Sequence, residues 1–322
     1  MKKSFFLSVV IPVYNEGVNI KYLIDVLEKE LTYYANHEVI LVDDGSTDST
    51  LEILKAQHLK NSKFNYITFS RNFGHQFALK AGLDNSKGDC VISMDGDLQH
   101  PPNLIHDMIN LWLEGNDVVY SIREDDDTIT FFKKKTSELF YYLVNKISDV
   151  KITKGAADFR LLDRKVINVI INLQDAHLFL RGIIPWVGFK QTFIRFKANE
   201  RHGGESKYTF FKMFKFATNG ITSFSIKPLQ ISIVFGFIIS FFTFFYALYA
   251  IYVSLFTDIV ISGWTSVIAS VLFLGGIQLI FMGIIGEYIG KIFIQIRNRP
   301  NYIIQETTLN VPVIKTSEEI KS

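Results

Sequence analysis

The sequence predicts an α/β domain with a mainly parallel sheet, followed by an interfacial helical region and a C-terminal hairpin of two transmembrane helices. Three observations support this fold class. Short apolar runs alternate with helical patterns up to about residue 125, acidic clusters directly follow several of the expected strands, and two long segments near the C-terminus carry no charge. A chain of 322 residues is long enough for about two such units.

Composition excludes several classes of protein. Hydrophobic residues make up 48% of the chain, which is too much for a disordered protein. The 34 basic and 32 acidic residues leave a net charge of +2, so the strong basic excess of a general nucleic-acid binder is absent. The single cysteine, Cys90, excludes a disulfide scaffold or a cysteine-rich zinc protein and is typical of a reducing cytoplasm.

The first 125 residues are expected to alternate between strand and helix. The expected strands are Phe6–Pro12, Glu38–Val42, Phe64–Ser70, Asp89–Met94 and Val118–Ile122. The expected helices are Val18–Tyr34, Thr47–Gln57, Gly74–Asn85 and Pro102–Glu114. This alternation predicts a mainly parallel sheet covered on both faces, with ligands bound beyond the carboxyl ends of the strands.

The first strand could also be mistaken for a signal peptide, because Lys2 and Lys3 precede an apolar run. The run is short and no small-residue cleavage pattern follows it, which favours the strand.

Two uncharged segments, Leu229–Thr257 and Ile259–Gly286, are separated only by Asp258. A helix of this length is about 42 Å long, more than the roughly 30 Å hydrocarbon core requires. Two buried core helices are the alternative, although uncharged stretches this long are unusual in soluble folds. Basic residues flank the pair on its outer sides: Lys212, Lys215, Lys227, Lys291, Arg297 and Arg299. Both chain ends are therefore expected on the cytoplasmic side of the cytoplasmic (inner) membrane.

These features predict the division of the chain. Residues 1–205 form the cytoplasmic α/β domain and residues 206–227 an amphipathic juxtamembrane region, for which an ordinary helix packed on the domain is the alternative. Residues 228–290 hold the two transmembrane helices, and residues 291–322 form a cytoplasmic tail.

Polar clusters stand directly after three expected strands: Tyr14-Asn15-Glu16, Asp43-Asp44 and Asp95-Gly96-Asp97. Such ends lie along one rim of a parallel sheet, where neighbouring carboxylates need a cation or hydrogen-bond donors. Asp95 and Asp97, with Gln99, offer the hard oxygen ligands that suit Mg²⁺ or Mn²⁺ bridging phosphates. The glycine motifs of P-loop enzymes and dinucleotide dehydrogenases are absent. The histidines His75, His100, His106 and His202 lack metal-ligand spacing, so no chemistry is assigned to them.

The order of these motifs resembles a known family. Pro12-Val-Tyr-Asn-Glu16, Val42-Asp-Asp-Gly-Ser46, Arg71-Asn-Phe-Gly74 and Asp95-Gly-Asp-Leu-Gln99 are similar to the motif series of family 2 glycosyltransferases, which have a Rossmann-like GT-A fold. More narrowly, the chain resembles the polyprenyl-phosphate glycosyltransferases, the group of dolichyl-phosphate mannosyltransferase and bactoprenol glucosyltransferase. The segments that match this subgroup are Asp158–Arg164, Arg201–Tyr208 and Gly286–Gly290.

The resemblance implies a donor site. Pro12, Tyr14 and Glu16 would line the nucleotide pocket, and Asp43 and Asp44 would lie near the base and ribose. The metal and the diphosphate would be held by Asp95, Asp97 and Gln99. Arg71 would help to shape the pocket, although an ordinary surface arginine is the alternative. Asp158 would position or deprotonate the acceptor.

The resemblance also implies a cationic site for the acceptor phosphate. Its candidate residues are Arg123, Lys133, Lys134, Lys135, Ser137, Arg201, Ser206 and Lys207. Which of the three lysines faces the phosphate stays open, and a lysine triplet alone is more typical of a solvated surface.

The expected reaction is the inverting transfer of one sugar from a nucleotide diphosphate sugar to a polyprenyl phosphate such as undecaprenyl phosphate. Uridine diphosphate is preferred over guanosine diphosphate on overall likeness. Transfer to another lipid, a processive polysaccharide synthase and a non-catalytic membrane scaffold are the alternatives. No Gln-x-x-Arg-Trp motif indicates the synthase, and the acids that a scaffold would have lost are present. The lipid bilayer is an expected partner, nucleic acid is not, and self-association through the transmembrane helices is expected from relatives.

Overall fold

The computed structural model describes residues 5–124, 135, 146, 155–173, 175, 178–197, 222, 225–256 and 263–310. The chain forms two compact units. The first, here called the sheet unit, spans residues 1–142, 150–209 and 299–322. The second, the helix unit, spans residues 143–149 and 210–298.

The sheet unit is built on one eight-stranded sheet with the order β7-β5-β6-β4-β1-β2-β3-β8. The strands are β1 (Leu7–Val13), β2 (His37–Asp43), β3 (Phe64–Phe69), β4 (Cys90–Ser93), β5 (Val118–Arg123), β6 (Ala156–Asp163), β7 (Gln191–Phe196) and β8 (Ile304–Thr307). Strands β4, β1, β2 and β3 are mutually parallel, and β5 is parallel to β7. The α/β class and the mostly parallel sheet expected from the sequence are confirmed.

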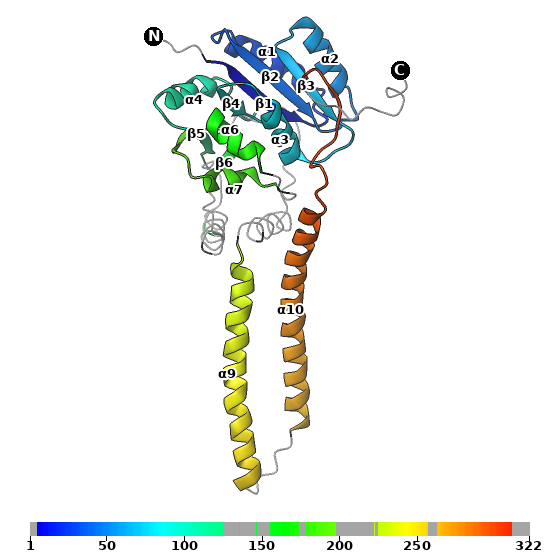
Figure 1. The fold of residues 1–322 in the computed structure, drawn as a ribbon, viewed down its shortest axis with the longest axis vertical. Helices are drawn as coiled ribbons and strands as arrows, with labels where there is room; N and C mark the ends of the chain where they lie inside the picture. The colour runs from blue at the N-terminus through cyan, green and yellow to red at the C-terminus, as the bar shows by residue number, and fades with distance from the viewer. Residues whose placement is uncertain are drawn as a thin grey trace. The chain divides into compact units, whose positions relative to one another are not determined.

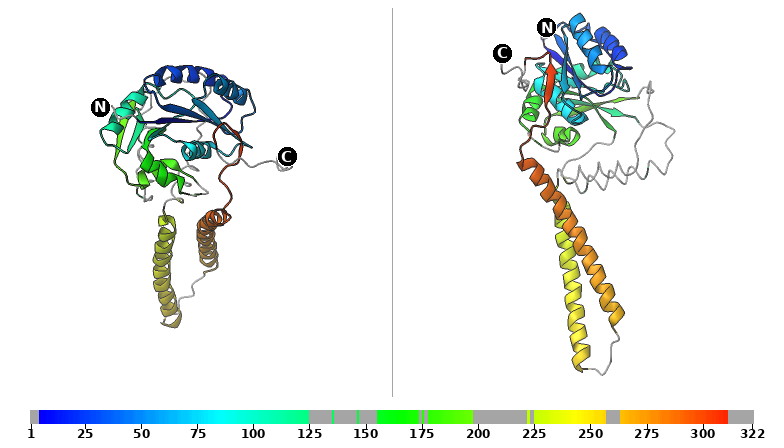
Figure 2. Two further views of the ribbon diagram at one scale, coloured as in Figure 1. Left: turned by 45° about the horizontal axis from the view of Figure 1, so that its top comes forward. Right: turned by 90° about the vertical axis from the view of Figure 1, so that its right-hand side faces the viewer.

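Helices cover both faces of this sheet (Figures 1 and 2). They are α1 (Ile20–Leu31), α2 (Thr50–Lys60), α3 (His75–Asn85), α4 (Leu104–Leu113), α6 (Arg164–Ile171) and α7 (Leu180–Trp186). Side chains alternate along β1, so Leu7, Val9 and Ile11 join the core cluster that includes residues of α1 and α4. Val10 points to the other face, where its Cγ1 lies only 2.1 Å from where a Cβ on Gly82 of α3 would stand.

Helix α1 shows why the local pattern was sufficient to find these helices. Its buried residues are Ile20, Leu23, Ile24, Leu27 and Leu31, the spacing of one helical face. The helix is shorter at both ends than the expected Val18–Tyr34, as is usual where the capping residues are polar or exposed.

Three strands were not expected from the sequence. Strand β6 lies between β4 and β5 and is antiparallel to both, so the sheet is mixed. Strand β7 forms one edge beside β5, and β8 pairs antiparallel with β3 at the other edge. The expected C-terminal tail begins at residue 291, whereas α10 (Trp264–Ile296) extends beyond that point. Within the expected tail, residues 304–307 form β8 and pair with the open edge of β3.

The helix unit contains α9 (Lys227–Phe256) and α10, which lie side by side (Figures 1 and 2). Segments 227–246 and 267–296 are long and apolar enough to cross a membrane. Large side chains such as Phe237, Phe242 and Leu272 are exposed on them. The second helix runs from 264 to 296 rather than from 259 to 286, since the apolar pattern continues past Lys291. The expected juxtamembrane region lies almost wholly outside the described residues.

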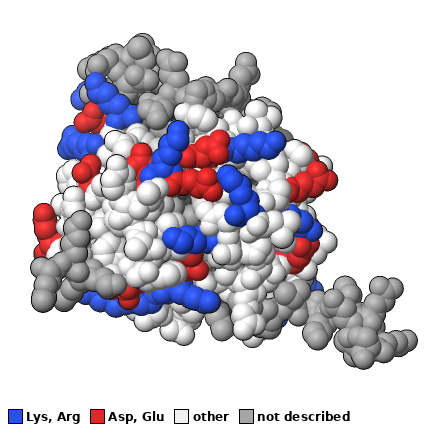
Figure 3. Space-filling model, turned by 90° about the horizontal axis from the view of Figure 1, so that it is seen from above, with Lys and Arg blue, Asp and Glu red and all other residues white. Residues whose placement is uncertain are grey.

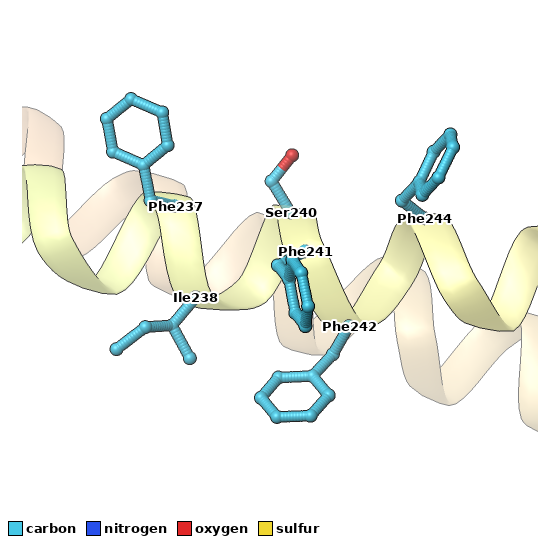
Figure 4. A pocket seen from close by; sticks show the side chains of 6 residues that line it. All are labelled: Phe237, Ile238, Ser240, Phe241, Phe242 and Phe244. Atoms are coloured by element: carbon cyan, nitrogen blue, oxygen red, sulfur yellow. The ribbon is translucent and has the colours of Figure 1, made fainter.

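Apolar side chains of α9 point to opposite sides of the helix. Figure 4 shows Phe237 and Phe244 on one side and Ile238 and Phe242 on the other, around a shallow apolar pocket lined by α9 alone. A helix that is apolar all round is typical of a buried or membrane-spanning segment.

Candidate active site

The candidate active site lies where the parallel strands β1, β2 and β4 end, as expected for ligands in open α/β sheets. Three short segments follow these ends: residues 14–16, 44–47 and 94–100. A fourth segment, residues 71–74, connects β3 to α3 and is held against the second by hydrogen bonds.

Asp43 and Asp44 organise the loops at the end of β2. Asp43 is 1% exposed and accepts hydrogen bonds from the Ser46 backbone N–H at 3.0 Å and from the Thr68 hydroxyl at 2.6 Å. The carboxylate of Asp44 accepts from the backbone N–H groups of Phe73 at 2.7 Å and of Gly74 at 2.9 Å. Burial raises the pKa of Asp44, and these two hydrogen bonds oppose the rise. Both acids therefore hold the loops at this edge of the sheet in place by accepting hydrogen bonds from backbone N–H groups.

Gly45 allows this close packing. Its φ is +72°, a conformation that L-residues with side chains rarely adopt. An added Cβ would stand 2.6 Å from the carbonyl carbon of Arg71. The turn after β2 can therefore touch the loop of residues 71–74 only with glycine at this position.

The turn after β1 is tied to the same rim. The Asn15 N–H donates to the Ser46 hydroxyl at 2.9 Å, and the Asn15 side chain accepts from the Thr47 N–H at 2.8 Å. Tyr14 is 45% exposed, whereas Pro12 is buried within β1 opposite Val42. Glu16 accepts a hydrogen bond from the Asn19 side chain at 2.8 Å. Of the expected pocket residues after β1, Tyr14 is thus accessible to a ligand and Pro12 supports the turn from within the strand.

On the β4 side, a histidine and two acids come together. One ligand atom each of His75, Asp95 and Asp158 lies within 4.8 Å of the other two. His75, the first residue of α3, places Nε2 at 2.8 Å from Asp95 Oδ1. Burial lowers the pKa of His75, but the hydrogen bond and charge of Asp95 outweigh it and raise this pKa overall. Burial likewise works against ionised Asp95, yet the bond from His75 leaves its pKa lowered.

Asp97, Gln99 and His100 form the turn that follows. The Gln99 N–H donates to Asp97 Oδ1 at 3.2 Å, and the turn passes through Leu98 with a φ of +61°. His100 is 6% exposed, stacks on Phe159 and lies with Nδ1 at 3.8 Å from Asp95 Oδ2. Burial lowers the pKa of His100, which favours the neutral ring.

Two arginines compensate the charge of Asp158. Arg181 of α7 donates from Nε and from a terminal nitrogen to the two carboxylate oxygens, each at 2.8 Å, a bidentate pair. Arg160, which is 4% exposed, has a terminal nitrogen 3.9 Å from Asp158 Oδ1. Burial alone would raise the pKa of Asp158, but Arg181 brings it down to about 2. Asp158 is therefore a carboxylate at any physiological pH.

The donor set fits a divalent cation. The carboxylate oxygens of Asp95 and Asp158 are ligands that suit Mn²⁺ or Mg²⁺, and each of these oxygens keeps lone pairs beyond those used in the hydrogen bonds above. Among the described residues, His75, Asp95 and Asp158 form the group close enough to hold a metal ion. Asp97 and Gln99 lie in the turn directly after Asp95.

Other predicted residues lie apart from this cluster or outside the described part of the chain. Arg71 stands over the Phe73 ring at 3.9 Å and donates to the Asn72 carbonyl at 2.9 Å, so it belongs to the loop beside Asp44. Arg123 is exposed at the end of β5. The residues predicted for the acceptor phosphate that lie outside the described residues are Lys133, Lys134, Ser137, Arg201, Ser206 and Lys207.

Sequence reasoning missed His75 and Arg181. The expectation that His75 has no chemical role overlooked its place as the first residue after the Arg71–Gly74 motif, at the start of α3, which packs on β1 and β2. No spacing rule could have linked Arg181 to Asp158, because α7 and β6 meet only in the tertiary structure. The only signal was a charged residue inside an apolar segment, Leu178–Ile184.

Two comparisons show the family. Residues 8–171 match Glycosyl transferase family 2. An uncharacterized glycosyltransferase, YkcC of Bacillus subtilis (strain 168), is 42% identical over 308 residues, covering 95% of each chain. The SfII prophage-derived bactoprenol glucosyl transferase of Shigella flexneri is 40% identical over 303 residues, covering 94% of this chain and 98% of the relative.

Among solved structures, mannosyl-3-phosphoglycerate synthase from Rubrobacter xylanophilus aligns with a TM-score of 0.47 at 15% identity, covering 67% of this chain and 71% of that one. The family match ends within α6 and includes the strands and loops that carry His75, Asp95 and Asp158. The similarity to the relatives extends over nearly the whole chain. The chain therefore belongs to glycosyl transferase family 2 and is a glycosyltransferase.

Proposed function

We propose that this enzyme transfers a single sugar from a nucleotide diphosphate sugar to a polyprenyl phosphate, with inversion at the anomeric carbon. The donor is a uridine diphosphate hexose of the glucose type. The acceptor is undecaprenyl phosphate in the cytoplasmic leaflet of the cytoplasmic membrane, and the product is a lipid-linked sugar for modification of cell-envelope glycans such as lipopolysaccharide.

One observation carries the proposal: the acidic cluster of His75, Asp95 and Asp158 occurs in a chain that also has two long, apolar and exposed helices. The cluster suits a metal-bound diphosphate, and the helices suit an acceptor that resides in a membrane. The relatives named bactoprenol glucosyl transferase, similar over more than nine-tenths of the chain, support the same pairing of donor and acceptor.

On the donor side, different residues would bind the metal ion, contact the nucleotide and position the loops around it. Asp95, Asp97 and Gln99, with His75, would hold Mg²⁺ or Mn²⁺, which when bound neutralises the diphosphate and stabilises the charge that develops on the leaving group. Tyr14 and Glu16 would contact the nucleotide. Asp43, Asp44 and Arg71 would act through the loops that they position near the base and ribose.

On the acceptor side, an oxygen of the lipid phosphate bonds to the anomeric carbon as the bond to the nucleoside diphosphate breaks and its electron pair leaves with the diphosphate. The lipid phosphate is already an anion near neutral pH, its second pKa being about 6, so little general-base help is needed. Because Arg181 bonds both carboxylate oxygens of Asp158 and lowers its pKa to about 2, Asp158 is a weak base, and we assign it an orienting role. The acceptor phosphate would be neutralised by Arg123, one of the three lysines Lys133, Lys134 and Lys135, Ser137, Arg201, Ser206 and Lys207.

The proposal extends to topology. Both chain ends would lie in the cytoplasm, residues 1–205 would form the catalytic domain apart from its final strand β8, and copies of the chain would associate through α9 and α10.

The decisive experiment incubates the full-length enzyme in detergent with undecaprenyl phosphate, Mg²⁺ or Mn²⁺ and a panel of nucleotide sugars. Mass spectrometry of the lipid fraction identifies the donor and the product. We expect a hexosyl-phosphoryl lipid from one uridine diphosphate sugar. The absence of a glycolipid with every donor would contradict the proposal, and transfer to diacylglycerol instead would favour the alternative lipid acceptor.

The variant Asp97→Asn, which removes a proposed metal ligand, should abolish turnover. The matched control is Asp107→Asn, which makes the same change at an exposed position on α4. Retained activity in Asp97→Asn would overturn the metal assignment.

A further inference from the structure

The chain segment that follows α10 returns to the sheet unit and contacts both ends of the segment that carries Arg71 and His75. We propose that this strap, residues 301–308, holds the donor site in its binding geometry, with Tyr302 as the main positioning residue. The proposal rests on the donor site described under Proposed function.

The first contact is at the end of β3. Strand β8 pairs antiparallel with β3 and lies beside it in the sheet (Figures 1 and 2). The Ser70 N–H donates to the Ile303 carbonyl at 3.1 Å, and the Tyr302 ring stacks on Phe69 with centroids 5.1 Å apart and an interplanar angle of 13°. Ser70 is the residue directly before Arg71. The strap therefore fixes the point at which the loop of residues 71–74, here called the donor loop, leaves the sheet.

This loop is the one that packs on the end of β2. Residues 73 and 74 donate their N–H groups to Asp44, and Arg71 contacts Gly45 at a distance that admits no Cβ. A shift at Ser70 would therefore be transmitted to the Asp43–Ser46 turn, where the base and ribose are proposed to bind.

The second contact is at the other end of α3. The Tyr302 hydroxyl donates to Asp84 Oδ2 at 3.0 Å, and Lys80 pairs with the other oxygen of the same carboxylate. Lys80 and Asp84 are both largely withdrawn from solvent, with 5% and 19% of their side chains exposed. Asp84 lies near the C-terminal end of the helix whose first residue is His75, which bonds Asp95 at 2.8 Å. The strap thus fixes the helix that presents His75 to the acidic cluster.

The remaining contacts anchor the strap away from the site. Glu306 pairs with Lys55 of α2 at 2.7 Å and accepts a hydrogen bond from the Tyr66 hydroxyl. Thr308 accepts from the Tyr66 N–H at 3.0 Å. These contacts hold β8 in register without touching the donor loop or α3, so they provide a control for the test.

The test compares Tyr302→Ala, Tyr302→Phe and Glu306→Gln in full-length enzyme, with UDP titration by calorimetry, steady-state kinetics for both substrates and thermal unfolding. Tyr302→Ala should weaken UDP binding and raise the donor KM by roughly tenfold, the size of effect seen when an outer-shell partner is lost. The acceptor KM at saturating donor should stay unchanged.

Tyr302→Phe keeps the stack on Phe69 and loses only the hydrogen bond to Asp84, so its donor KM should rise by about threefold, within the range of one hydrogen bond. Glu306→Gln should leave donor binding unchanged.

Several outcomes would overturn the positioning role. They are an unchanged donor KM in both Tyr302 variants, an equal change in Glu306→Gln, and a loss of kcat that follows the fraction of unfolded enzyme while the donor KM holds. If Tyr302→Ala does not fold, Tyr302→Phe decides the question alone. Failure of the proposed function is seen separately, as the absence of product with the unaltered enzyme.

Discussion

At the scale of single residues, the site depends on charge compensation within a small space. Asp95 and Asp158 both lie close to His75. Asp95 is stabilised as a carboxylate by His75, and Asp158 by Arg181 together with Arg160. A buried carboxylate without such a partner would be protonated or would disrupt its surroundings. The partners are therefore as necessary to the site as the acids themselves.

Arg181→Gln tests this at Asp158. The folded-state pKa of Asp158 is about 2, below the ordinary value of 3.8, so the stabilisation by Arg181 is complete above pH 3.8 and is lost as the pH falls toward 2. Without Arg181, burial raises this pKa. We expect turnover to fall roughly 10–100-fold at neutral pH and the acid limb of the pH–activity profile to move to higher pH. Arg195→Gln, on the exposed side of β7, is the control, and an unmoved acid limb would refute the role of Arg181.

His75→Ala tests the metal cluster by a measurement that does not depend on turnover. Removing the imidazole should weaken Mn²⁺ binding by roughly tenfold or more, as followed by electron paramagnetic resonance titration. His58→Ala on α2, which removes a ring that bonds the Phe64 carbonyl, serves as the matched control. Equal Mn²⁺ affinity in the His75 variant and the unaltered enzyme would remove His75 from the metal site.

At the scale of elements, helix α3 connects the core to the chemistry. It begins at His75, packs on β1 and β2, and makes its closest approach at Gly82, above Val10. Glycine at this position lets the helix lie close to the sheet, which brings His75 within reach of Asp95. The position of His75 is thus set about two helical turns away, by a residue with no side chain.

Gly82→Ala should therefore destabilise the protein and weaken metal binding together. The new Cβ would stand 2.1 Å from Val10 Cγ1, and overpacking of this kind costs about 1–3 kcal/mol. Thermal unfolding and Mn²⁺ titration provide the two measurements. The double variant with Val10→Ala, which removes the opposing methyl groups, should recover much of the loss. A double variant no better than Gly82→Ala would show that Val10 is not the source of the strain.

For the molecule as a whole, the chain forms two compact units whose surfaces differ in polarity. On the face of the molecule seen in Figure 3, basic and acidic side chains are interspersed, so that face has no large area of a single charge. In the helix unit, by contrast, aromatic and aliphatic side chains are exposed along α9 and α10. Exposed apolar surface of this extent requires a partner, and for helices of this length a bilayer meets the requirement.

We expect the protein to sediment with membranes and to resist extraction by high salt and by alkaline carbonate, while detergent releases it. Reporter fusions at the two chain ends should both give the cytoplasmic signal, since basic residues flank the hairpin on its outer sides. Release by carbonate would contradict membrane insertion, and a periplasmic signal from either end would contradict the proposed topology.

Much of the fold and part of the site could be predicted from sequence because the relevant information is local. The alternation of apolar runs and helical faces located β1 to β5 and α1 to α4, and long uncharged segments located α9 and α10. The motifs after the strands identified Asp43, Asp44, Asp95 and Asp97, since parallel strands bring their carboxyl ends to one rim whatever their order.

Strand order and long-range packing required the tertiary structure. The insertion of β6 between β4 and β5 brings Asp158 beside Asp95, and the packing of α3 and α7 adds His75 and Arg181. The pairing of β8 with β3 depends on an open sheet edge more than 230 residues earlier in the chain. Sequence alone located β1 to β5, α1 to α4 and the two long apolar helices, because periodicity and composition are properties of neighbouring residues. Which charges meet was seen only in the folded chain, because the partners of a buried acid are selected by how distant elements pack.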